Sequence, residues 1–372
     1  MMDQSLSNFI DEACGENRLR VEDDLGDGFV RLRVSEAERR QAVHDIRSSE
    51  DIAIELLRNA RDANASTIFL STCKIESTRS LVILDDGDGV PEGLHHAVFE
   101  PRVTSKLDSA HVDKWGVHGR GMALYSISVN ADEAYIASSA PGKGSSFVVR
   151  SHVERVGERA DQSTFPAFLK GEGNVVSVRG PRNILRTACE FALDCRDRCS
   201  VYFGSPVEVA ATLYAFGKGS LSPSVLAFCA NPDDVPVVKR LSVASTPAEF
   251  ASLAQGIGLD MSQRSARRII DGDIKPLPSL LDRVKSEGFQ PAAVKGSRTS
   301  TAGAPQTETS SLVARKSTVR FAQRDIDEFQ DRIRAALAPL AKAYYLETSV
   351  SPTIKVRNGE LKISIPLVDD DS

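Results

Sequence analysis

The sequence predicts an α+β fold in which a mixed sheet packs against helices, followed by a small helical module and a short C-terminal α+β piece. Apolar runs of strand length, bounded by residues that favour turns, predict the strands. They lie at residues 67–73, 80–84, 133–138, 146–152, 174–179 and 200–203. Capped segments with apolar residues at helical spacing lie before and between these runs, and they predict the helices.

Composition limits the class of protein. At 372 residues, the chain is long enough for about two or three domains. Every apolar run falls short of the roughly twenty residues that cross a bilayer, and residues 1–20 are too acidic and polar for a secretory signal. We therefore expect a cytoplasmic protein with no membrane segment. The net charge of −5 gives no overall attraction to nucleic acid, so such binding would need a local basic patch. The six cysteines form no C-x-x-C pair, which favours reduced thiols over a metal site.

Two helices are predicted ahead of the first strand. A Ser-x-x-Glu capping box at Ser35 predicts the first of them. The second begins at Ser48 or Ser49, with acidic residues in its first turn, and carries Glu55 and Asn59. Because Glu55 and Asn59 are four residues apart, they project from the same helix face about one turn from each other. One of these side chains can activate water and the other can ligate a metal ion.

An acidic turn follows the second predicted strand. The apolar run of residues 81–84 ends at Asp85, and Gly87 and Gly89 come directly afterwards. A strand that ends in a carboxylate and two closely spaced glycines delivers that carboxylate to a tight turn. We therefore regard Asp85 as a candidate binding residue.

A glycine-rich segment comes next. Gly116, Gly119 and Gly121 precede a predicted helix that begins near residue 122. The backbone amides of such a loop and the dipole of the helix favour phosphate. Residues 107–115, just before it, are polar without a period, which favours a mobile lid over an ordinary surface loop. Together with the helix and the acidic turn, this segment indicates an ATP site.

The three motifs ELLRNARDANA, LDDGDGVP and KWGVHGRGMALYS, in this order and spacing, resemble those of the GHKL ATPases. This superfamily includes gyrase B subunits, histidine kinases, the ninety-kilodalton heat-shock chaperones and MutL. The resemblance covers roughly residues 50–209 and is strongest from residue 55 to residue 125. It implies a Bergerat-type α/β sandwich that binds ATP and Mg²⁺. The Thr-Ser-Lys run that ends at Lys106 resembles the segment entering the lid of MutL, so MutL and the topoisomerase VI B subunit are the nearest types.

The resemblance implies a role for each motif residue. Glu55 would be the general base, Asn59 would ligate Mg²⁺, and Asp85 would accept a hydrogen bond from the adenine amino group. The residues expected to contact nucleotide are Asn59, Asp85, Gly87, Gly89, Lys106, Gly116, Val117, His118, Gly119, Arg120, Gly121 and Asn174. The family commonly has a threonine where this sequence has Asn174. In MutL and the type II topoisomerases a lysine from a neighbouring domain completes the site, and none can be assigned here.

Changes in composition divide the chain. Residues 290–318 are rich in Ser, Thr, Ala, Gly, Gln and Pro, with few large apolar residues, which is typical of a flexible linker. The predicted parts are an N-terminal arm (1–34), the GHKL ATP-binding domain (35–210), a connecting segment with a helical module (211–289), the linker (290–318) and a C-terminal helix and hairpin (319–372).

Two predicted helices of the connecting segment, residues 247–255 and 262–270, flank a Gly-Ile-Gly turn. Their spacing resembles a helix-turn-helix of the phage-repressor type. The resemblance implies that Arg264, Arg267 and Arg268 face DNA, where phosphate contacts would give affinity and base edges any specificity. A plain helical packing module with a solvated basic face is the alternative, and the sequence leaves both open.

Three functions are consistent with these motifs. The first is an ATP-binding protein, with Mg²⁺-dependent hydrolysis, that acts as a conformational switch and associates with DNA. By resemblance to MutL, we expect it to form an ATP-dependent homodimer and to act with a further protein partner. The second is a histidine kinase-like phosphotransfer protein, for which His44 is the only upstream candidate acceptor. The third is a regulator that binds nucleotide without hydrolysing it.

Overall fold

The computed structural model describes residues 21–105, 111–113, 116–118, 121–170, 176–287, 289–291, 329–333, 353–357 and 360–364. The chain divides into two units, Met1–Lys295 and Gly296–Ser372, and the division falls within the predicted linker. In the second unit, β14 (Thr353–Arg357) and β15 (Glu360–Ser364) form the predicted antiparallel hairpin. No helix among the described residues has both the length and the apolar character needed to cross a bilayer.

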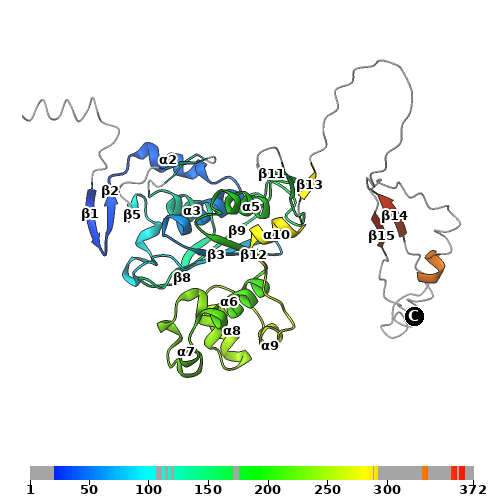
Figure 1. Cartoon of the computed structure of the whole chain (residues 1–372). Helices are drawn as coiled ribbons and strands as arrows, with labels where there is room; N and C mark the ends of the chain where they lie inside the picture. Colours follow the sequence, from blue (N-terminus) through cyan, green and yellow to red (C-terminus); the bar gives the residue numbers. More distant parts are fainter. Residues whose placement is uncertain are drawn as a thin grey trace, which may run out of the picture. The chain divides into compact units, whose positions relative to one another are not determined.

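A five-stranded sheet forms the centre of the first unit (Figure 1). Its spatial order is β12-β3-β4-β9-β8, and β12 is parallel to β3 whereas the other neighbours are antiparallel. The strands are β3 (Thr67–Ile75), β4 (Thr78–Asp85), β8 (Glu133–Ser139), β9 (Ser145–His152) and β12 (Ser200–Gly204). All five were predicted to within two residues, and the expected mixed sheet packed against helices is confirmed.

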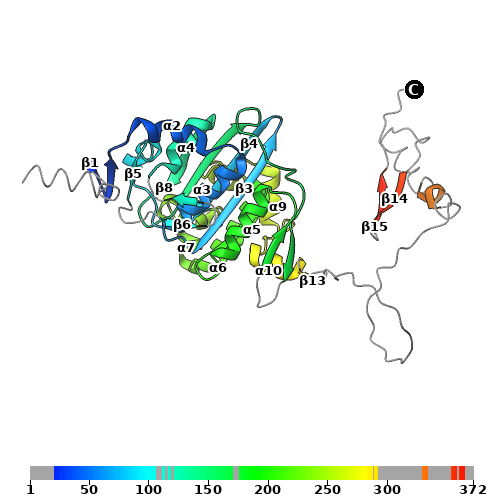
Figure 2. The same ribbon diagram turned by 90° about the horizontal axis from the view of Figure 1, so that it is seen from above.

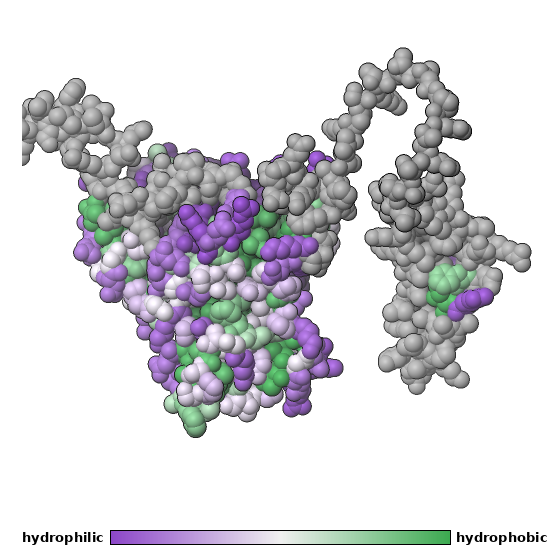
Figure 3. All heavy atoms as spheres, in the orientation of Figure 1, coloured by the Kyte–Doolittle hydropathy of each residue, from purple (hydrophilic) through white to green (hydrophobic). Residues whose placement is uncertain are grey.

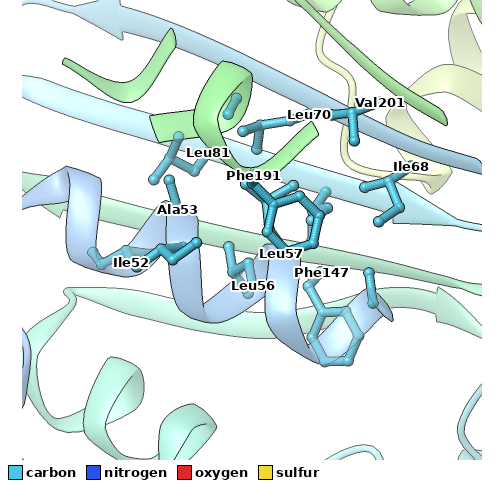
Figure 4. Packing of buried hydrophobic residues seen from close by; sticks show 14 of the residues in the cluster. Ile52, Ala53, Leu56, Leu57, Ile68, Leu70, Leu81, Phe147, Phe191 and Val201 are labelled. Carbon is cyan, nitrogen blue, oxygen red and sulfur yellow. The ribbon is translucent and has the colours of Figure 1, made fainter. Parts of the chain in front are cut away.

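The first face of this sheet carries the main core. Its helices are α3 (Ser49–Asp62), α4 (Ala123–Asn130), α5 (Ile184–Asp194) and α10 (Leu280–Glu287). Leu56 and Leu57 of α3 pack with Leu70 of β3 and Phe191 of α5 (Figure 4). The view from above shows α3 and α5 side by side over the sheet (Figure 2). Ser48 caps α3 through its side chain, so this helix, which carries Glu55 and Asn59, begins where the sequence predicts.

A layer of helices covers the second face of the sheet. We call residues 206–270 the helical layer. Its elements are α6 (Pro206–Ser220), α7 (Pro223–Phe228), the 3₁₀ helices η4 (Pro232–Asp234) and η5 (Val237–Val243), α8 (Pro247–Gly256) and α9 (Gln263–Ile270). Phe69, Leu84 and Val148 of the sheet share one apolar cluster with Phe250 of α8 and Ile269 of α9. Alternate residues of each strand therefore contact different cores, because side chains of a strand alternate between its faces.

The predicted boundary between residues 210 and 211 falls inside α6. This helix begins at a capping box formed by Ser205 and Glu208, with Pro206 at its first position, which is a sequence signal that our prediction overlooked. The predicted connecting segment shares its apolar residues with the sheet rather than with a core of its own. In the space-filling view, the surface of the helical layer carries apolar and hydrophilic residues side by side (Figure 3).

Short elements lie between β4 and the glycine-rich segment. Two 3₁₀ turns, η1 (Glu92–Leu94) and η2 (Ala97–Phe99), follow Pro91. Gly93 and the absence of a side-chain cap at Pro91 both disfavour a continuous helix. β6 (His111–Asp113), within the predicted lid of residues 107–115, pairs with β7 (Gly116–His118), so the first glycine of the third motif lies in a strand.

Two small sheets flank the central one. In the first, β1 (Val21–Gly26) pairs with β2 (Phe29–Leu32), and β2 pairs with β5 (Val103–Thr104), directly before the lid. Part of the predicted arm therefore forms two strands of the first unit, followed by α2 (Glu36–Asp45) with the predicted capping box. The second small sheet contains β10 (Ala167–Lys170), β11 (Val176–Arg179) and β13 (Phe289–Pro291). The predicted strand at 174–179 thus belongs to this sheet and not to the central one.

The helical layer should unfold together with the sheet. Phe250 is fully buried and packs edge-to-face on Tyr214, with ring centroids 5.6 Å apart. We expect Phe250→Ala to lower the free energy of unfolding by about 3–5 kcal/mol, because it leaves a cavity in the shared core. Chemical denaturation should show one transition for this unit at a lower midpoint. Phe228→Ala is the control, since Phe228 is 84% exposed, and it should leave the midpoint unchanged. A separate early transition in the Phe250 variant would contradict the shared core.

Candidate functional site

A cavity of about 150 Å³ lies where α3, the end of β4 and the residues flanking the lid come together. Its described lining includes Asn59, Asp85, Gly89 and Gly121, which belong to all three sequence motifs. The other lining residues are Phe29, Leu56, Ala60, Asp62, Ala63, Asp88, Val90, Val98, Val103, Thr104, Ser105, Ala123, Leu124, Ser145 and Phe147. The fold thus assembles the predicted helix, acidic turn and glycine segment around one cavity, most of whose lining is apolar.

The carboxylate of Asp85 is the buried acid of this cavity. Asp85 ends β4 and is 1% exposed. Burial raises the pKa of Asp85 to about 7, and the nearby negative charges of Asp86 and Asp88 act in the same direction. The backbone N–H of Gly87 opposes this shift by donating to Asp85 Oδ1 at 2.9 Å. Asp85 therefore stands at the cavity as a carboxyl group that changes charge near neutral pH.

Gly87 and Gly89 are required because backbone carbonyl groups of other segments lie too close to these positions for a side chain. A Cβ at Gly87 would lie 2.4 Å from the carbonyl oxygen of Ala63, and one at Gly89 would lie 2.0 Å from that of Ala140. Gly89 also has a φ of 75°, which side chains rarely adopt. Both glycines were predicted to contact nucleotide. Gly89 does line the cavity, but the tight packing of the turn already explains both residues.

Asn59 lines the cavity and has a buried, unpaired N–H donor. Its Nδ2 atom is buried and has no hydrogen-bond partner in the described part of the chain. Leaving a buried amide unpaired costs roughly 1–3 kcal/mol, which makes such a group a candidate for ligand contact. The side chain lines the cavity one turn after Glu55, as the spacing on α3 predicts. The unpaired N–H donor fits a contact with a phosphate oxygen, whereas the predicted role as a Mg²⁺ ligand would use the side-chain oxygen of Asn59.

Glu55 has a different environment from Asn59. Its Oε1 accepts a hydrogen bond from Nη1 of Arg58 at 2.5 Å, in an ion pair between residues three apart on α3. Glu55 is not among the residues that line the cavity. The predicted general base and the predicted metal ligand thus share a helix but not, in this conformation, the same cavity wall.

The other residues predicted to contact nucleotide are described only in part. Lys106, Gly119, Arg120 and Asn174 lie outside the described residues, and Gly116, Val117 and His118 form strand β7, whose backbone alone is described. Gly121 is described, and its carbonyl oxygen accepts a hydrogen bond from the backbone N–H of Arg102 at 2.8 Å. The backbone before the predicted lid, at residue 102, is therefore hydrogen-bonded to the backbone after it, at residue 121.

Several lining residues were not predicted. Asp88 belongs to the acidic turn itself and accepts a hydrogen bond from Asn64 at 2.8 Å, so the motif contained a signal for it. Asp62, one turn after Asn59, could have been found by the same helical spacing. Phe29 comes from the arm, which has no period that would have indicated a contact with the site.

The three arginines of the predicted DNA-binding helix are exposed. Arg264, Arg267 and Arg268 lie on α9, whose Ala266 and Ile269 are buried in the shared core. Six residues, 257–262, separate α8 from α9, more than the three or four of a typical helix-turn-helix. The packing alternative therefore describes the fold of this segment, and DNA binding stays a prediction.

Comparison with known families agrees with this geometry. Residues 47–168 match the family described as "Histidine kinase-, DNA gyrase B-, and HSP90-like ATPase". This part of the chain is therefore a GHKL-type ATPase domain, which implies ATP binding. Among solved structures, the chain is similar to full-length ShkA in complex with AMPPNP, at 15% identity and a TM-score of 0.22. That similarity covers 54% of this chain and 38% of ShkA. No curated protein matches the chain.

The raised pKa of Asp85 predicts a stability change with pH. The folded protein holds this proton up to about pH 7, whereas the unfolded chain loses it near pH 4, so the stability contributed by protonation is full below about pH 4 and is lost as pH rises from there to about 7. We expect Asp85→Asn, which cannot ionise, to exceed the wild type in stability at pH 8 by an amount on the order of a few kcal/mol. Urea unfolding without nucleotide at pH 5 and pH 8 measures this difference. Asp271→Asn, at an exposed site, should show no such pH dependence. A stability difference that is equal at both pH values would mean that the folded-state pKa of Asp85 is not raised.

Proposed function

We propose that this protein is a Mg²⁺-dependent ATPase that acts as a nucleotide-driven conformational switch, nearest in kind to MutL and the topoisomerase VI B subunit. The observation that carries this proposal is that Asn59 of α3 and Asp85 of β4 line one cavity within a GHKL-type domain. A buried carboxyl group and an asparagine with an unpaired N–H donor, in one cavity, would supply contacts for the two ends of a nucleotide.

Asp85 would bind the adenine. Its carboxylate, in the ionised form, can accept the hydrogen bond that the amino group of adenine donates. Guanine offers a carbonyl oxygen at that position, so it would leave a buried carboxylate facing another acceptor. Because the amino group stabilises the ionised form, we expect nucleotide binding to lower the pKa of Asp85 from its value of about 7 in the free protein.

Asn59 would hold the metal end of the nucleotide. A neutral amide oxygen suits Mg²⁺, which keeps several waters and takes few protein ligands. When bound, Mg²⁺ would neutralise phosphate charge during transfer. Glu55, one turn earlier on the same helix, would accept the proton of the attacking water. To do so, its carboxylate must leave the position it has beside Arg58.

Two other functions have weaker support. A phosphotransfer role needs an acceptor histidine, and His44 is exposed in the last turn of α2, a helix that packs on α4 of the nucleotide domain. A regulator that binds ATP without hydrolysing it is favoured by one observation, the ion pair that holds Glu55 away from the cavity. Homodimerisation and a further protein partner stay predictions.

Nucleotide binding and hydrolysis can be separated by two substitutions. ATP with Mg²⁺ should raise the melting temperature of the wild type, because a ligand that binds only the folded state stabilises it. Glu55→Ala should keep this rise and lose phosphate release by about a hundredfold or more, the usual contribution of a general base. Asp85→Asn should abolish the rise. A rise that survives in Asp85→Asn would disprove the adenine assignment, and label from ATP retained on His44 would favour phosphotransfer.

A second proposal concerns DNA. The three exposed arginines of α9 form a local cationic surface on a chain whose net charge is −5, and we propose that this surface contacts DNA phosphates. Asp273 lies 3.9 Å from Arg268 and reduces the charge there. Binding would therefore be weak and dependent on salt.

Changing Arg264, Arg267 and Arg268 together to alanine should abolish DNA binding measured by fluorescence anisotropy at low salt. The control is the triple alanine variant of Arg39, Arg40 and Arg47, which removes the same charge from exposed positions on or beside α2. Equal loss in both variants would indicate a general effect of charge, and no binding by the wild type at low salt would reject the proposal.

A further inference from the structure

Arg58 is a buried cation within the helix that carries the nucleotide-binding residues. Its side chain is 3% exposed, whereas that of Glu55 is 20% exposed. An arginine side chain stays charged in proteins, so its burial is unfavourable unless anions and hydrogen-bond acceptors surround it. Glu55 supplies one such acceptor, with Arg58 Nη1 and Glu55 Oε1 2.5 Å apart. The buried guanidinium of Arg58 therefore holds the carboxylate of Glu55 in a defined position.

Glu55 and Asn59 lie on the same helix, α3, but their side chains have different surroundings. Residues three apart on a helix are neighbours on its surface, so Glu55 can reach Arg58 without distortion of the backbone. Asn59 follows Arg58 in the chain, yet it lines the cavity and its Nδ2 atom has no partner. The group expected to bind nucleotide is therefore ready, while the group expected to activate water is held by an ion pair.

This ion pair opposes catalysis by Glu55 in two ways. One carboxylate oxygen accepts a charge-assisted hydrogen bond from Arg58, which fixes the direction of the carboxylate and leaves fewer acceptor sites for water. The carboxylate also lies outside the set of groups that line the cavity, and a general base has to be within hydrogen-bond reach of the water it activates. Moving Glu55 to the cavity would separate it from a cation that is buried and must then be satisfied by other groups.

We infer that Arg58 is a positioning residue that holds Glu55 away from the bound nucleotide, so that ATP binding and ATP hydrolysis are controlled separately. This inference rests on the function proposed above, in which Glu55 is the general base. Arg58 would then affect the rate of ATP hydrolysis without touching ATP. The isolated chain should then bind ATP readily and hydrolyse it slowly, until a partner or a change of conformation releases Glu55.

Substitution of Arg58 tests the inference by its separate effects on kcat and on affinity. In Arg58→Met, which keeps much of the side-chain volume but removes the charge, we expect kcat to rise about tenfold or more, within the range that a general base contributes. The affinity for ATP, from melting temperatures across an ATP titration of the full chain, should change by less than about twofold, because Asn59 and Asp85 are untouched. Arg58→Lys keeps a cation near Glu55 and should behave as the wild type.

Two controls separate this effect from loss of structure. Arg79→Met removes another buried arginine, which lies on β4 away from the cavity and pairs with Glu158. This variant should leave kcat unchanged. Adding Glu55→Ala to Arg58→Met should abolish the gain in kcat. Arg58→Gln, a milder change, is measured in parallel in case the methionine variant does not fold.

Each outcome decides the inference. Unchanged or lower kcat in Arg58→Met or Arg58→Gln, with ATP binding intact, overturns it while leaving the proposed nucleotide site in place. Loss of ATP affinity in both variants also overturns it, because Arg58 would then serve binding. Failure of both variants to fold would assign Arg58 a structural role alone. Absence of any ATP-induced rise in the wild type would reject the proposed function and this inference together.

Discussion

The site depends on the burial of one carboxylate at the end of a central strand. Asp85 is 1% exposed, and an ionised carboxylate at such a position is unfavourable unless donors compensate it. The turn after β4 supplies the N–H of Gly87, and this turn can form only because residue 87 has no side chain to meet the carbonyl of Ala63. That carbonyl belongs to the end of α3, so the same contact fixes the strand, the turn and the helix that carries Asn59. The cavity is a consequence of this packing.

Much of this arrangement could be predicted because the signals are local. Serine caps at Ser35 and Ser48 predicted two helices, and apolar runs bounded by turn residues predicted the five central strands. The candidate residues of α3 and β4 followed from spacing alone. Glu55, Asn59 and Asp85 could be named because their positions within single elements determine where they point.

What could not be predicted depends on contacts between distant segments. The helical layer shares a core with the sheet, but nothing in residues 206–270 indicates which surface they cover. The pairing of β2 with β5, and the contact of Phe29 with the cavity, are likewise tertiary. Arg58 is a different case. Its spacing from Glu55 was visible in the sequence, but its burial was not, and burial is what gives the ion pair its influence on the site.

The strand β4 has a property that concerns how the domain could signal. Val82 and Leu84 contact the helical layer, whereas Ile83 contacts the core beneath α3, and the next residue is Asp85. One strand is therefore in contact with both cores and ends in the carboxylate expected to bind adenine. A shift of β4 along its axis would be transmitted to both layers by direct packing, with no hinge between them. The position of the helical layer would then change together with that of β4.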